Sequence, residues 1–571
     1  MTFTALVFDQ DSEAWWRFAD PVAVLEANTP SELPGVLTQA EQHGLKGGYA
    51  VGFVTYEAAS GFDPSLKHQP AKLIPLASFA LFDNPTVIDV PDASVQMDFV
   101  PEAGREQFDT AFEQIKKHLL QGDSYQINYT HRLKGPVTAP LESVFGAMLR
   151  GQPTPFGLMI ESPTFGICSV SPELFFQRVG TKLTCEPMKG TRPRGRSSVE
   201  DQELLSDLQN SPKDRAENLM IVDMVRNDLG RIAEPGSVAV SHLFETRAYP
   251  TVWQQVSEVS ATVDAPIAAI FAALFPCASV TGAPKTKSME IIANLESSPR
   301  GVYTGALGMI KPGGDARFSV AIRTLFVDKA SREGTFGVGG GIVWDSDVEE
   351  EWQESLTKAS VLRHQPPVFQ LLETMRYDPE TGIARRDYHM ERLAASAQYF
   401  NFCFDSLAAT QLLNDVDQDT AVRLRLLLAR GGELELQQLP LPALQRRMKL
   451  ALASLPVDRS DTFLFHKTTA RQVYDAAYQT RGEADDVILF NLEEELTETT
   501  ISNLYLEIAG ELLTPALSAG LLAGTYRRQM LAEGRAREAR LTLSDLARAD
   551  RLFVSNSLRG LSEAELLSPF D

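Results

Sequence analysis

Hydrophobic and polar positions recur with helical and strand spacing in the first part of the chain. Arg105–Gln121 places its apolar side chains on one helical face, and Gly122 ends that pattern. The alternating stretch that follows, 122–130, predicts a strand. Nearer the N-terminus, the pattern predicts a helix over Ser31–His43 and a strand over Gly48–Tyr56. The same region therefore contains both helices and strands.

Two further predicted helices carry acidic residues on one face. Ser211–Ile232 opens with Ser at an N-cap position and Pro at the first helical position, and 349–360 forms the second helix. Acidic residues three positions apart share a helical face. A single such pair is usually solvated, whereas carboxylates from two converging helices suit Mg²⁺. The residues concerned are Asp214 and Glu217 in the first helix, and Glu351 and Glu354 in the second, with Lys358 continuing that face.

Composition narrows the class of protein. The chain has 571 residues, which predicts more than one domain, and its 44% hydrophobic and 22% charged residues are typical of a globular protein. A net charge of −22 argues against a nucleic-acid binder. No apolar run is long enough to span a membrane, the N-terminus lacks the pattern of a secretion signal, and the four cysteines form no disulfide framework. We therefore expect a cytoplasmic protein without membrane or nucleic-acid partners.

A constrained segment, CEPMKGTRPRG, lies at 185–195. Its two glycines allow sharp backbone turns, and its two prolines stiffen the chain around Lys189. We expect a turn there whose lysine is a fixed cation, a nucleophile activated by desolvation, or an ordinary solvated side chain. Glu173 stands at the start of an apolar strand, where desolvation would raise its pKa, although a surface glutamate fits the local sequence equally well.

This segment resembles the P-I-K-G-T loop of the chorismate-utilising enzymes, specifically aminodeoxychorismate synthase component I. Related anthranilate synthases usually carry alanine in place of Lys189, and a histidine roughly where Gln254 stands. The resemblance spans roughly residues 45–360 and implies an α+β fold of two packed sheets with outer helices. Its other matching segments are TYEAASGFDP (55–64), GDSYQINYT (122–130), SPELFF (171–176), CASVTGAPK (277–285), GVYTGALG (301–308), FSVAIRTL (318–325) and GVGGGIVWDS (337–346).

The resemblance implies that Lys189 and Glu173 work together in catalysis, the lysine as a nucleophile and the glutamate as a proton carrier. We interpret Glu57, Gln126 and Asn128 as structural residues, although each stands in a matching segment. FSVAIRTL alternates as a strand and is expected to deliver an arginine for carboxylate binding. The residues that the resemblance assigns to chorismate are Thr281, Gly282, Tyr303, Arg323, Gly339, Gly340 and Lys358.

The same resemblance implies a magnesium site. Glu217 and Glu354 would be direct ligands, with Glu351 and Asp214 in support.

After a predicted linker at 364–367, the pattern restarts in a second enzyme-like domain. Its segments LLETMR (371–376), FHKTTARQVYDAA (465–477) and ELTETTISNLY (495–505) resemble fold-type IV pyridoxal-phosphate proteins, the class IV aminotransferases, and are most similar to aminodeoxychorismate lyase. This implies two α/β subdomains and bound pyridoxal phosphate. Lys467 would bond to the cofactor aldehyde, and Glu498 would face its pyridine nitrogen. The residues implied to hold the phosphate are Arg392, Gly524, Thr525 and Ser557.

Together, the two resemblances predict a bifunctional synthase and lyase that makes 4-aminobenzoate for folate biosynthesis. We predict an N-terminal part at 1–100, a chorismate-binding domain at 101–363 and the lyase-like domain at 368–571. Ammonia would come from a separate glutamine amidotransferase subunit, and the second domain would form a homodimer. The alternatives are an anthranilate or isochorismate synthase, a non-catalytic second domain that serves interaction, and a second domain with aminotransferase activity.

Overall fold

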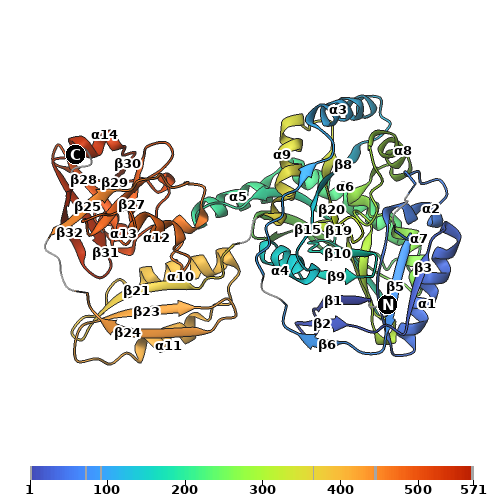
Figure 1. The fold of residues 1–571 in the computed structure, drawn as a ribbon, viewed down its shortest axis with the longest axis horizontal. Helices are drawn as coiled ribbons and strands as arrows, with labels where there is room; N and C mark the ends of the chain where they lie inside the picture. Colours follow the sequence, from blue (N-terminus) through green and yellow to red (C-terminus); the bar gives the residue numbers. More distant parts are fainter. Residues whose placement is uncertain (1–2, 71–73, 91–92, 364–365, 443–446, 568–571) are drawn as a thin grey trace. The chain divides into compact units, whose positions relative to one another are not determined.

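The computed structural model describes residues 3–70, 74–90, 93–363, 366–442 and 447–567. The chain divides into two compact units (Figure 1). Unit 1 comprises Met1–Pro193 and Leu205–Pro366, and unit 2 comprises Arg194–Leu204 and Pro367–Asp571. The predicted linker includes residues 364–365, which lie outside the described residues. The finer boundary at residue 100 stays a prediction.

Unit 1 contains two large antiparallel sheets among its described residues. The first has the strand order β16 (Gly282–Ala283), β8 (Gln126–Pro136), β20 (Glu333–Ile342), β19 (Thr324–Asp328), β10 (Phe165–Ser169), β9 (Leu158–Glu161), β1 (Thr4–Asp9), β2 (Ala14–Phe18) and β6 (Thr86–Ile88), with β7 (Val100–Pro101) beside β8. The second has the order β13 (Met188–Pro193), β15 (Val252–Thr262), β12 (Lys182–Cys185), β11 (Leu174–Val179), β18 (Ala316–Val320), β17 (Ala306–Ile310), β4 (Tyr49–Val54), β5 (Ala77–Phe82) and β3 (Ala23–Ala27), with β14 (Ala239–Ala248) beside β15.

The two sheets pack face to face through an apolar core. Side chains that alternate inward from β1 and β10 in the first sheet meet those from β4 and β17 in the second, including Phe53, Phe165 and Met309. Helices cover the outer faces, as expected for two packed sheets with outer helices. The helices of unit 1 are α1 (Leu33–Leu45), α2 (Ala59–Phe62), α3 (Arg105–Leu120), α4 (Leu141–Gly151), α6 (Pro212–Gly230), α7 (Ile267–Leu274), α8 (Lys285–Leu295) and α9 (Val348–Lys358), while α5 (Ser198–Asn210) contains the boundary between the units.

Each predicted helix of unit 1 is present within a few residues of its expected bounds. α3 matches the stripe of Arg105–Gln121, and α1 begins two residues after the predicted start at Ser31. α6 begins after Ser211, whose hydroxyl accepts a 3.3 Å hydrogen bond from the backbone N–H of Asp214. This N-cap satisfies one of the free donors at the helix start and fixes where the acidic face begins.

The described residues of unit 2 form two sheets, each with its own helices and core, which agrees with the expected two subdomains. The smaller sheet has the order β22 (Gly382–Ile383), β21 (Leu371–Asp378), β23 (Val422–Leu428) and β24 (Leu434–Pro440), and its helices are α10 (Arg386–Phe400) and α11 (Ser406–Asn414). The larger has the order β27 (Leu496–Thr499), β26 (Asp486–Phe490), β25 (Arg447–Leu452), β32 (Gly560–Leu566), β31 (Arg551–Asn556), β28 (Asn503–Ile508), β29 (Glu511–Pro515) and β30 (Arg537–Ala539), with α12 (Gln472–Tyr478), α13 (Thr525–Ala532) and α14 (Leu543–Arg548).

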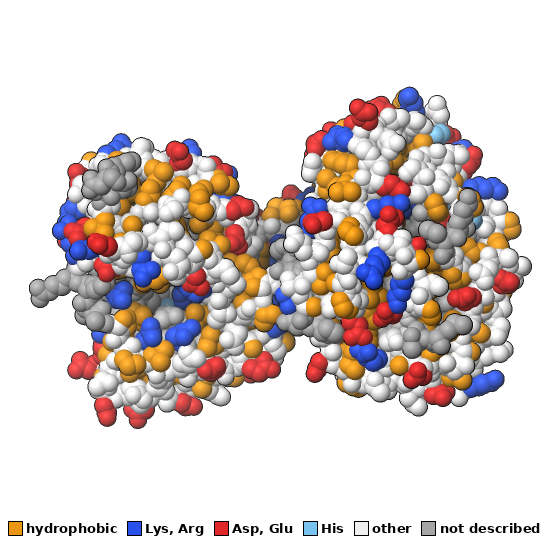
Figure 2. Space-filling view, viewed as in Figure 1, with side chains coloured by type: hydrophobic (Ala, Val, Ile, Leu, Met, Phe, Trp, Pro, Cys, Tyr) orange, Lys and Arg blue, Asp and Glu red, His pale blue; other side chains and the backbone are white. Residues whose placement is uncertain are grey.

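Two expectations from composition can be compared with the structure. All four cysteines are free. Among the described residues, no helix has the length and apolar character needed to cross a membrane. On the face drawn in Figure 2, acidic and basic side chains are interspersed on both units.

Candidate active sites

A cavity of about 340 Å³ in unit 1 brings together residues from distant parts of the sequence. Its walls come from β13, α6, β20 and α9, and from the connection between β18 and β19. The predicted residues that line it are Glu173, Lys189, Asp214, Glu217, Tyr303, Arg323, Gly339, Gly340, Glu351, Glu354 and Lys358. Two predicted substrate residues, Thr281 and Gly282, do not line it; Ser279 and Val280 of the same loop do.

Lys189 lies on the bulged strand β13 rather than on a free turn. Its Nζ is 3.1 Å from Oε2 of Glu217 on α6. The bulge depends on Gly190, whose φ of 97° is unfavourable for other residues. A Cβ at Gly190 would also lie 3.2 Å from Cβ of Asp214, so the glycine lets α6 approach the strand. Lys189 thus pairs with a predicted metal ligand, whereas the sequence had suggested Glu173 as its partner.

Glu173 lies immediately before β11 and is 3% exposed. Ser279 donates a 2.7 Å hydrogen bond from its hydroxyl to Oε1 of Glu173. Burial raises the pKa of this carboxyl to about 7, against the lowering effect of the Ser279 contact. The expected rise in pKa is therefore present, and Glu173 can hold a proton near neutral pH at the cavity wall.

The carboxylates of α9 approach the glycine run of β20. A Cβ added to Gly340 would lie 2.9 Å from Oε2 of Glu351 and 3.7 Å from Oε1 of Glu354. Burial raises the pKa of Glu351, whereas the Lys358 ammonium, 2.5 Å from Oε1 of Glu354, lowers the pKa of Glu354. Glycine at this position therefore lets the strand backbone approach two carboxylates.

These carboxylates supply the oxygen ligands that Mg²⁺ prefers. Within the described residues, however, they do not form a compact cluster with metal-binding geometry. Glu217 and Glu354 each face a lysine ammonium instead. The chemistry of the donor set fits the ion, and the present arrangement neutralises the same carboxylates with amines.

Arg323 differs from the strand position that its sequence pattern predicts. β18 ends at Val320 and β19 begins at Thr324, so the arginine lies on the short connection, with a φ of 51°. Its Nη1 donates to the backbone carbonyl of Lys358. Burial lowers the pKa of Arg323 to about 10, although the charge of the Glu354 carboxylate acts in the opposite direction.

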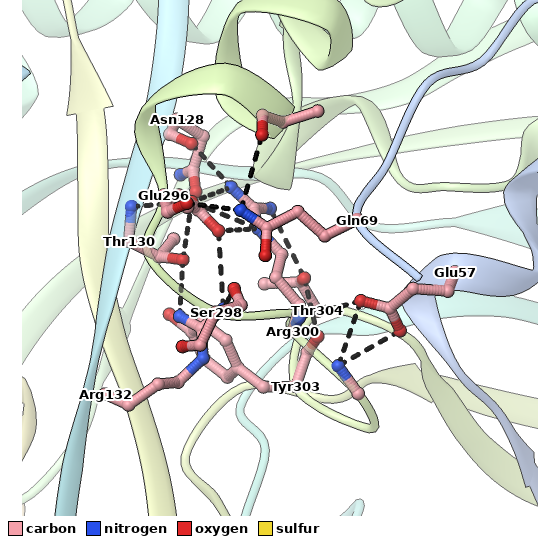
Figure 3. A network of polar contacts seen from close by, with 12 residues as sticks. Glu57, Gln69, Asn128, Thr130, Arg132, Glu296, Ser298, Arg300, Tyr303 and Thr304 are labelled. Carbon is pink, nitrogen blue, oxygen red and sulfur yellow. Dashed lines mark hydrogen bonds and ion pairs between the residues drawn. The ribbon is translucent and has the colours of Figure 1, made fainter. Parts of the chain in front are cut away.

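Behind Tyr303 lies a buried polar network that the sequence did not reveal. Figure 3 shows the carboxylate of Glu296 between the guanidinium groups of Arg132 and Arg300. The side chains of both arginines and of Glu296 are at most 4% exposed. Arg132 also lies over the ring of Tyr303, at 5.5 Å from its centroid. Two cations around one buried carboxylate support the ring that faces the cavity.

Arg300 connects the segments that carry the site. Its guanidinium donates to the carbonyl of Val280 at 2.7 Å and to the carbonyl of Asn128 at 2.7 Å. Its backbone N–H donates to Glu57 at 2.7 Å, and the N–H of Gly301 donates to the same carboxylate. These contacts give Glu57 the structural role expected for it, whereas Asn128 also lines the cavity. The only sequence signal for Arg300 was its place beside the GVYTGALG segment.

A cavity of about 370 Å³ in unit 2 contains Lys467. Burial, together with the nearby Arg392 cation, lowers the pKa of this lysine to about 8. A larger fraction of Lys467 is therefore neutral at physiological pH than of an exposed lysine. A neutral amine is the form that bonds to an aldehyde.

One end of this cavity gathers groups that bind phosphate. Arg392 from α10, Thr525 at the start of α13 and Ser557 after β31 all line it, as does Gly524. His389 donates or accepts hydrogen bonds with Ser557 at 2.7 Å and Thr525 at 3.2 Å through Nε2. Hydroxyls, a helix N-terminus and an arginine suit an anion.

Glu373 on β21 holds this end in place and was not identified from the sequence. It accepts hydrogen bonds from Nε and Nη2 of Arg392 at 2.8 and 2.7 Å, and lies 2.6 Å from Nδ1 of His389. Although burial opposes ionisation, the Arg392 cation and the contacts with Arg392 and His389 bring the pKa of Glu373 to about 2. The carboxylate therefore stays ionised, and it orients the guanidinium of Arg392 and the imidazole ring of His389.

Glu498 on β27, the residue predicted to face the pyridine nitrogen, lines the same cavity. Tyr474 donates to its Oε1 at 2.8 Å, the backbone N–H of Leu522 donates to the same atom at 3.0 Å, and Asn503 donates to Oε2 at 3.2 Å. Burial raises the pKa of Glu498 to about 7. The three donors fix the position of the carboxyl in the cavity.

Two families of known proteins match adjoining parts of the chain. Residues 86–364 match the family described as chorismate binding enzyme, and residues 370–565 match the family described as amino-transferase class IV. The second match implies pyridoxal phosphate, and the cavity around Lys467 has the groups to hold it.

Curated proteins and solved structures related to this chain match its chorismate binding part. The chain is 40% identical over 265 residues to an aminodeoxychorismate synthase component 1 of Klebsiella aerogenes, covering 46% of this chain and 58% of that protein. It is 36% identical over 303 residues to an anthranilate synthase component 1 of Haloarcula marismortui, covering 52% and 62%. The chain thus spans about three-fifths of the length of these relatives. The crystal structure of anthranilate synthase component I from Streptococcus pneumoniae matches with a TM-score of 0.54 at 23% identity, covering 64% of this chain and 92% of that one, which shows a shared fold.

Proposed function

We infer that this chain, which joins a member of the chorismate binding enzyme family at residues 86–364 to a class IV aminotransferase domain at residues 370–565, makes 4-aminobenzoate from chorismate. Unit 1 converts chorismate and ammonia to 4-amino-4-deoxychorismate. Unit 2 converts that intermediate to 4-aminobenzoate and pyruvate. The observation that carries the proposal is the position of the Lys189 amine in the cavity of unit 1, beside the carboxylates of α6 and α9.

In unit 1, Lys189 acts as the nucleophile. Its amine forms a C–N bond to the ring of chorismate, and the 4-hydroxyl leaves as water with a proton from Glu173. Ammonia then forms the C4–N bond and displaces the lysine, which returns to its free form. Burial supports this role for Glu173, because a pKa of about 7 keeps a proton available near neutral pH.

The carboxylates of chorismate are held at the cavity walls. Arg323 offers a buried guanidinium that forms no ion pair with the described residues, and Tyr303 lines the same cavity. Mg²⁺ would be held by Glu217, Glu351 and Glu354, and when bound it supplies positive charge to a substrate carboxylate.

In unit 2, the residues around the cavity fit pyridoxal phosphate. When bound, this cofactor supplies an electron-withdrawing ring. Arg392, Gly524, Thr525 and Ser557 hold its phosphate, and Glu498 faces its ring nitrogen. Lys467 takes the C4 proton of 4-amino-4-deoxychorismate; the C3–O bond then breaks, pyruvate leaves and the ring becomes aromatic.

Ammonia comes from a separate glutamine amidotransferase subunit. No cysteine of the printed sequence lies in the G-x-C-x-G turn that such a nucleophile uses. The component 1 designation of the Klebsiella relative supports a partner component. A homodimer through unit 2 and a cytoplasmic location are proposed from the sequence alone.

Product analysis tests both halves. The purified protein is incubated with chorismate, Mg²⁺, ammonium and pyridoxal phosphate, and aromatic products are separated. 4-Aminobenzoate and pyruvate support both units. Accumulated 4-amino-4-deoxychorismate supports unit 1 and points to the alternatives for unit 2, an interaction module or an aminotransferase.

Anthranilate synthase is the second candidate, because the Haloarcula relative carries that name at comparable identity. Lys189 favours the first candidate, since the related anthranilate synthases usually carry alanine there. Anthranilate as the main product would reverse this choice.

A further inference from the structure

Several arginines line the cavity of unit 2 away from its phosphate end, and two of them share one strand. They are Arg423 and Arg425 of β23, and alternation along this strand explains their direction. Leu424, Leu426 and Leu428 enter the core shared with α10 and α11, whereas the arginines alternate with them and face the cavity. The sheet thus turns two guanidinium groups toward the site that contains Lys467.

Neither arginine has an ion-pair partner in the part of the chain that the structure describes. Arg425 donates from Nη1 to the side-chain oxygen of Gln437 at 3.3 Å. Nε of Arg423 is buried and makes no hydrogen bond with the described residues. A buried, unpaired guanidinium donor is unfavourable unless a ligand satisfies it.

The neighbouring strands offer no carboxylate directly opposite this pair. Arg425 lies opposite Thr374 and Gln437, and Arg423 lies opposite Arg376 and Leu439. The residues directly opposite the pair on the adjacent strands are therefore cationic, neutral polar or apolar. By contrast, Arg392 at the phosphate end is neutralised by Glu373.

We propose that Arg423 and Arg425 form a subsite for a substrate carboxylate remote from the reacting amine. The proposal rests on the proposed function and names the specificity of the same cavity: unit 2 selects a dicarboxylate. 4-Amino-4-deoxychorismate carries two carboxylates, whereas most amino acids carry one. Planar guanidinium groups bind carboxylates through paired, charge-assisted hydrogen bonds.

The test uses the full-length protein with pyridoxal phosphate bound. Arg423→Gln and Arg425→Gln, singly and together, are compared with Arg376→Gln. Arg376 lies on the same sheet face beside Arg423, pairs with Asp378 at 3.6 Å and does not line the cavity. The visible absorption of the bound cofactor reports that each variant is folded and loaded.

We expect the double variant to raise the KM for isolated 4-amino-4-deoxychorismate about tenfold or more, because each lost charge-assisted contact weakens binding. kcat should change much less, and Arg376→Gln should leave KM unchanged. Competition by isophthalate, a dicarboxylate, and by benzoate, a monocarboxylate, gives a second measurement. Wild type should prefer isophthalate, and the double variant should lose that preference.

The outcomes separate this subsite from the proposed function. If wild type converts the substrate and the double variant keeps both its KM and its preference for isophthalate, the subsite is wrong. If wild type does not convert the substrate but the preference depends on the two arginines, the subsite stands and the proposed function of unit 2 fails.

Discussion

Nζ of Lys189 lies 3.1 Å from Oε2 of Glu217, and this ion pair joins β13 to α6 in the cavity of unit 1. An ammonium that is paired with a carboxylate is not a nucleophile. The amine must therefore leave Glu217 and lose its proton before it can attack the ring. The same carboxylate is a proposed metal ligand, so the pair links the two parts of the proposed site.

Replacement of Lys189 by Ala tests the covalent route. We expect ammonium-dependent formation of 4-amino-4-deoxychorismate to fall to background. The reason is that Lys189 is the lysine that β13 contributes to the described cavity, and alanine has no amine to attack the ring. Chromatography of the reaction products measures this. A variant that makes the intermediate at the wild-type rate would rule out the lysine adduct. Lys213→Ala is a matched control, since Lys213 lines the same cavity and has no role in the mechanism.

Replacement of Glu173 by Gln should lower the synthase rate about 10²–10⁴-fold, the usual contribution of a positioned acid or base. The pKa of about 7 predicts that the wild-type rate declines as pH rises above that value. The residual activity of the variant should not show this decline. Rates from pH 5.5 to 8.5 provide the measurement, and an unchanged pH profile in Glu173→Gln would contradict the assignment.

The same residue predicts a pH effect on stability. Its pKa is raised from 4.5 to about 7 in the folded protein, so the folded state binds the proton more tightly than the unfolded state. Its contribution to stability is greatest below pH 4.5 and is lost as pH rises through about 7. Thermal unfolding should therefore show Glu173→Gln gaining stability relative to wild type between pH 5 and pH 8. A constant difference across this range would argue against the raised pKa.

Replacement of Arg300 by Met should destabilise unit 1 by about 3 kcal/mol or more, because it removes one cation from a buried carboxylate. It also releases the carbonyls of Val280 and Asn128. Denaturant unfolding measures the loss. Lys287→Ala is the control, since its contact with Glu290 is exposed and should contribute little. Equal stability of the two variants would show that the network in Figure 3 is not a structural centre.

Replacement of Lys467 by Ala should stop 4-aminobenzoate formation and let 4-amino-4-deoxychorismate accumulate. The two proposed reactions are assigned to separate cavities, so the synthase rate should stay near that of wild type. The lowered pKa of about 8 predicts that wild-type protein takes up pyridoxal phosphate faster as pH rises toward 8, since more amine is then neutral. Visible absorption follows this uptake. Rates that do not depend on pH would argue against Lys467 as the reacting amine.

The sequence by itself determined the elements with strong local signals. The apolar stripe of α3 and the N-cap of α6 depend on neighbouring residues only, so their spacing predicts them. Most of the site residues that the resemblance of short segments indicated do line the two cavities. These segments are far apart in the chain, but each carries a recognisable local pattern.

Only the tertiary structure decided how the side chains pair. Lys189 faces Glu217 because a bulge at Gly190 and the approach of α6 set its direction. Arg323 lies outside the strand predicted for it, because the chain turns at this point from one sheet to the other. Arg300 and Glu373 act through long-range contacts that no local pattern encodes. Periodicity reports the face on which a residue lies, whereas its partner depends on packing between segments distant in sequence.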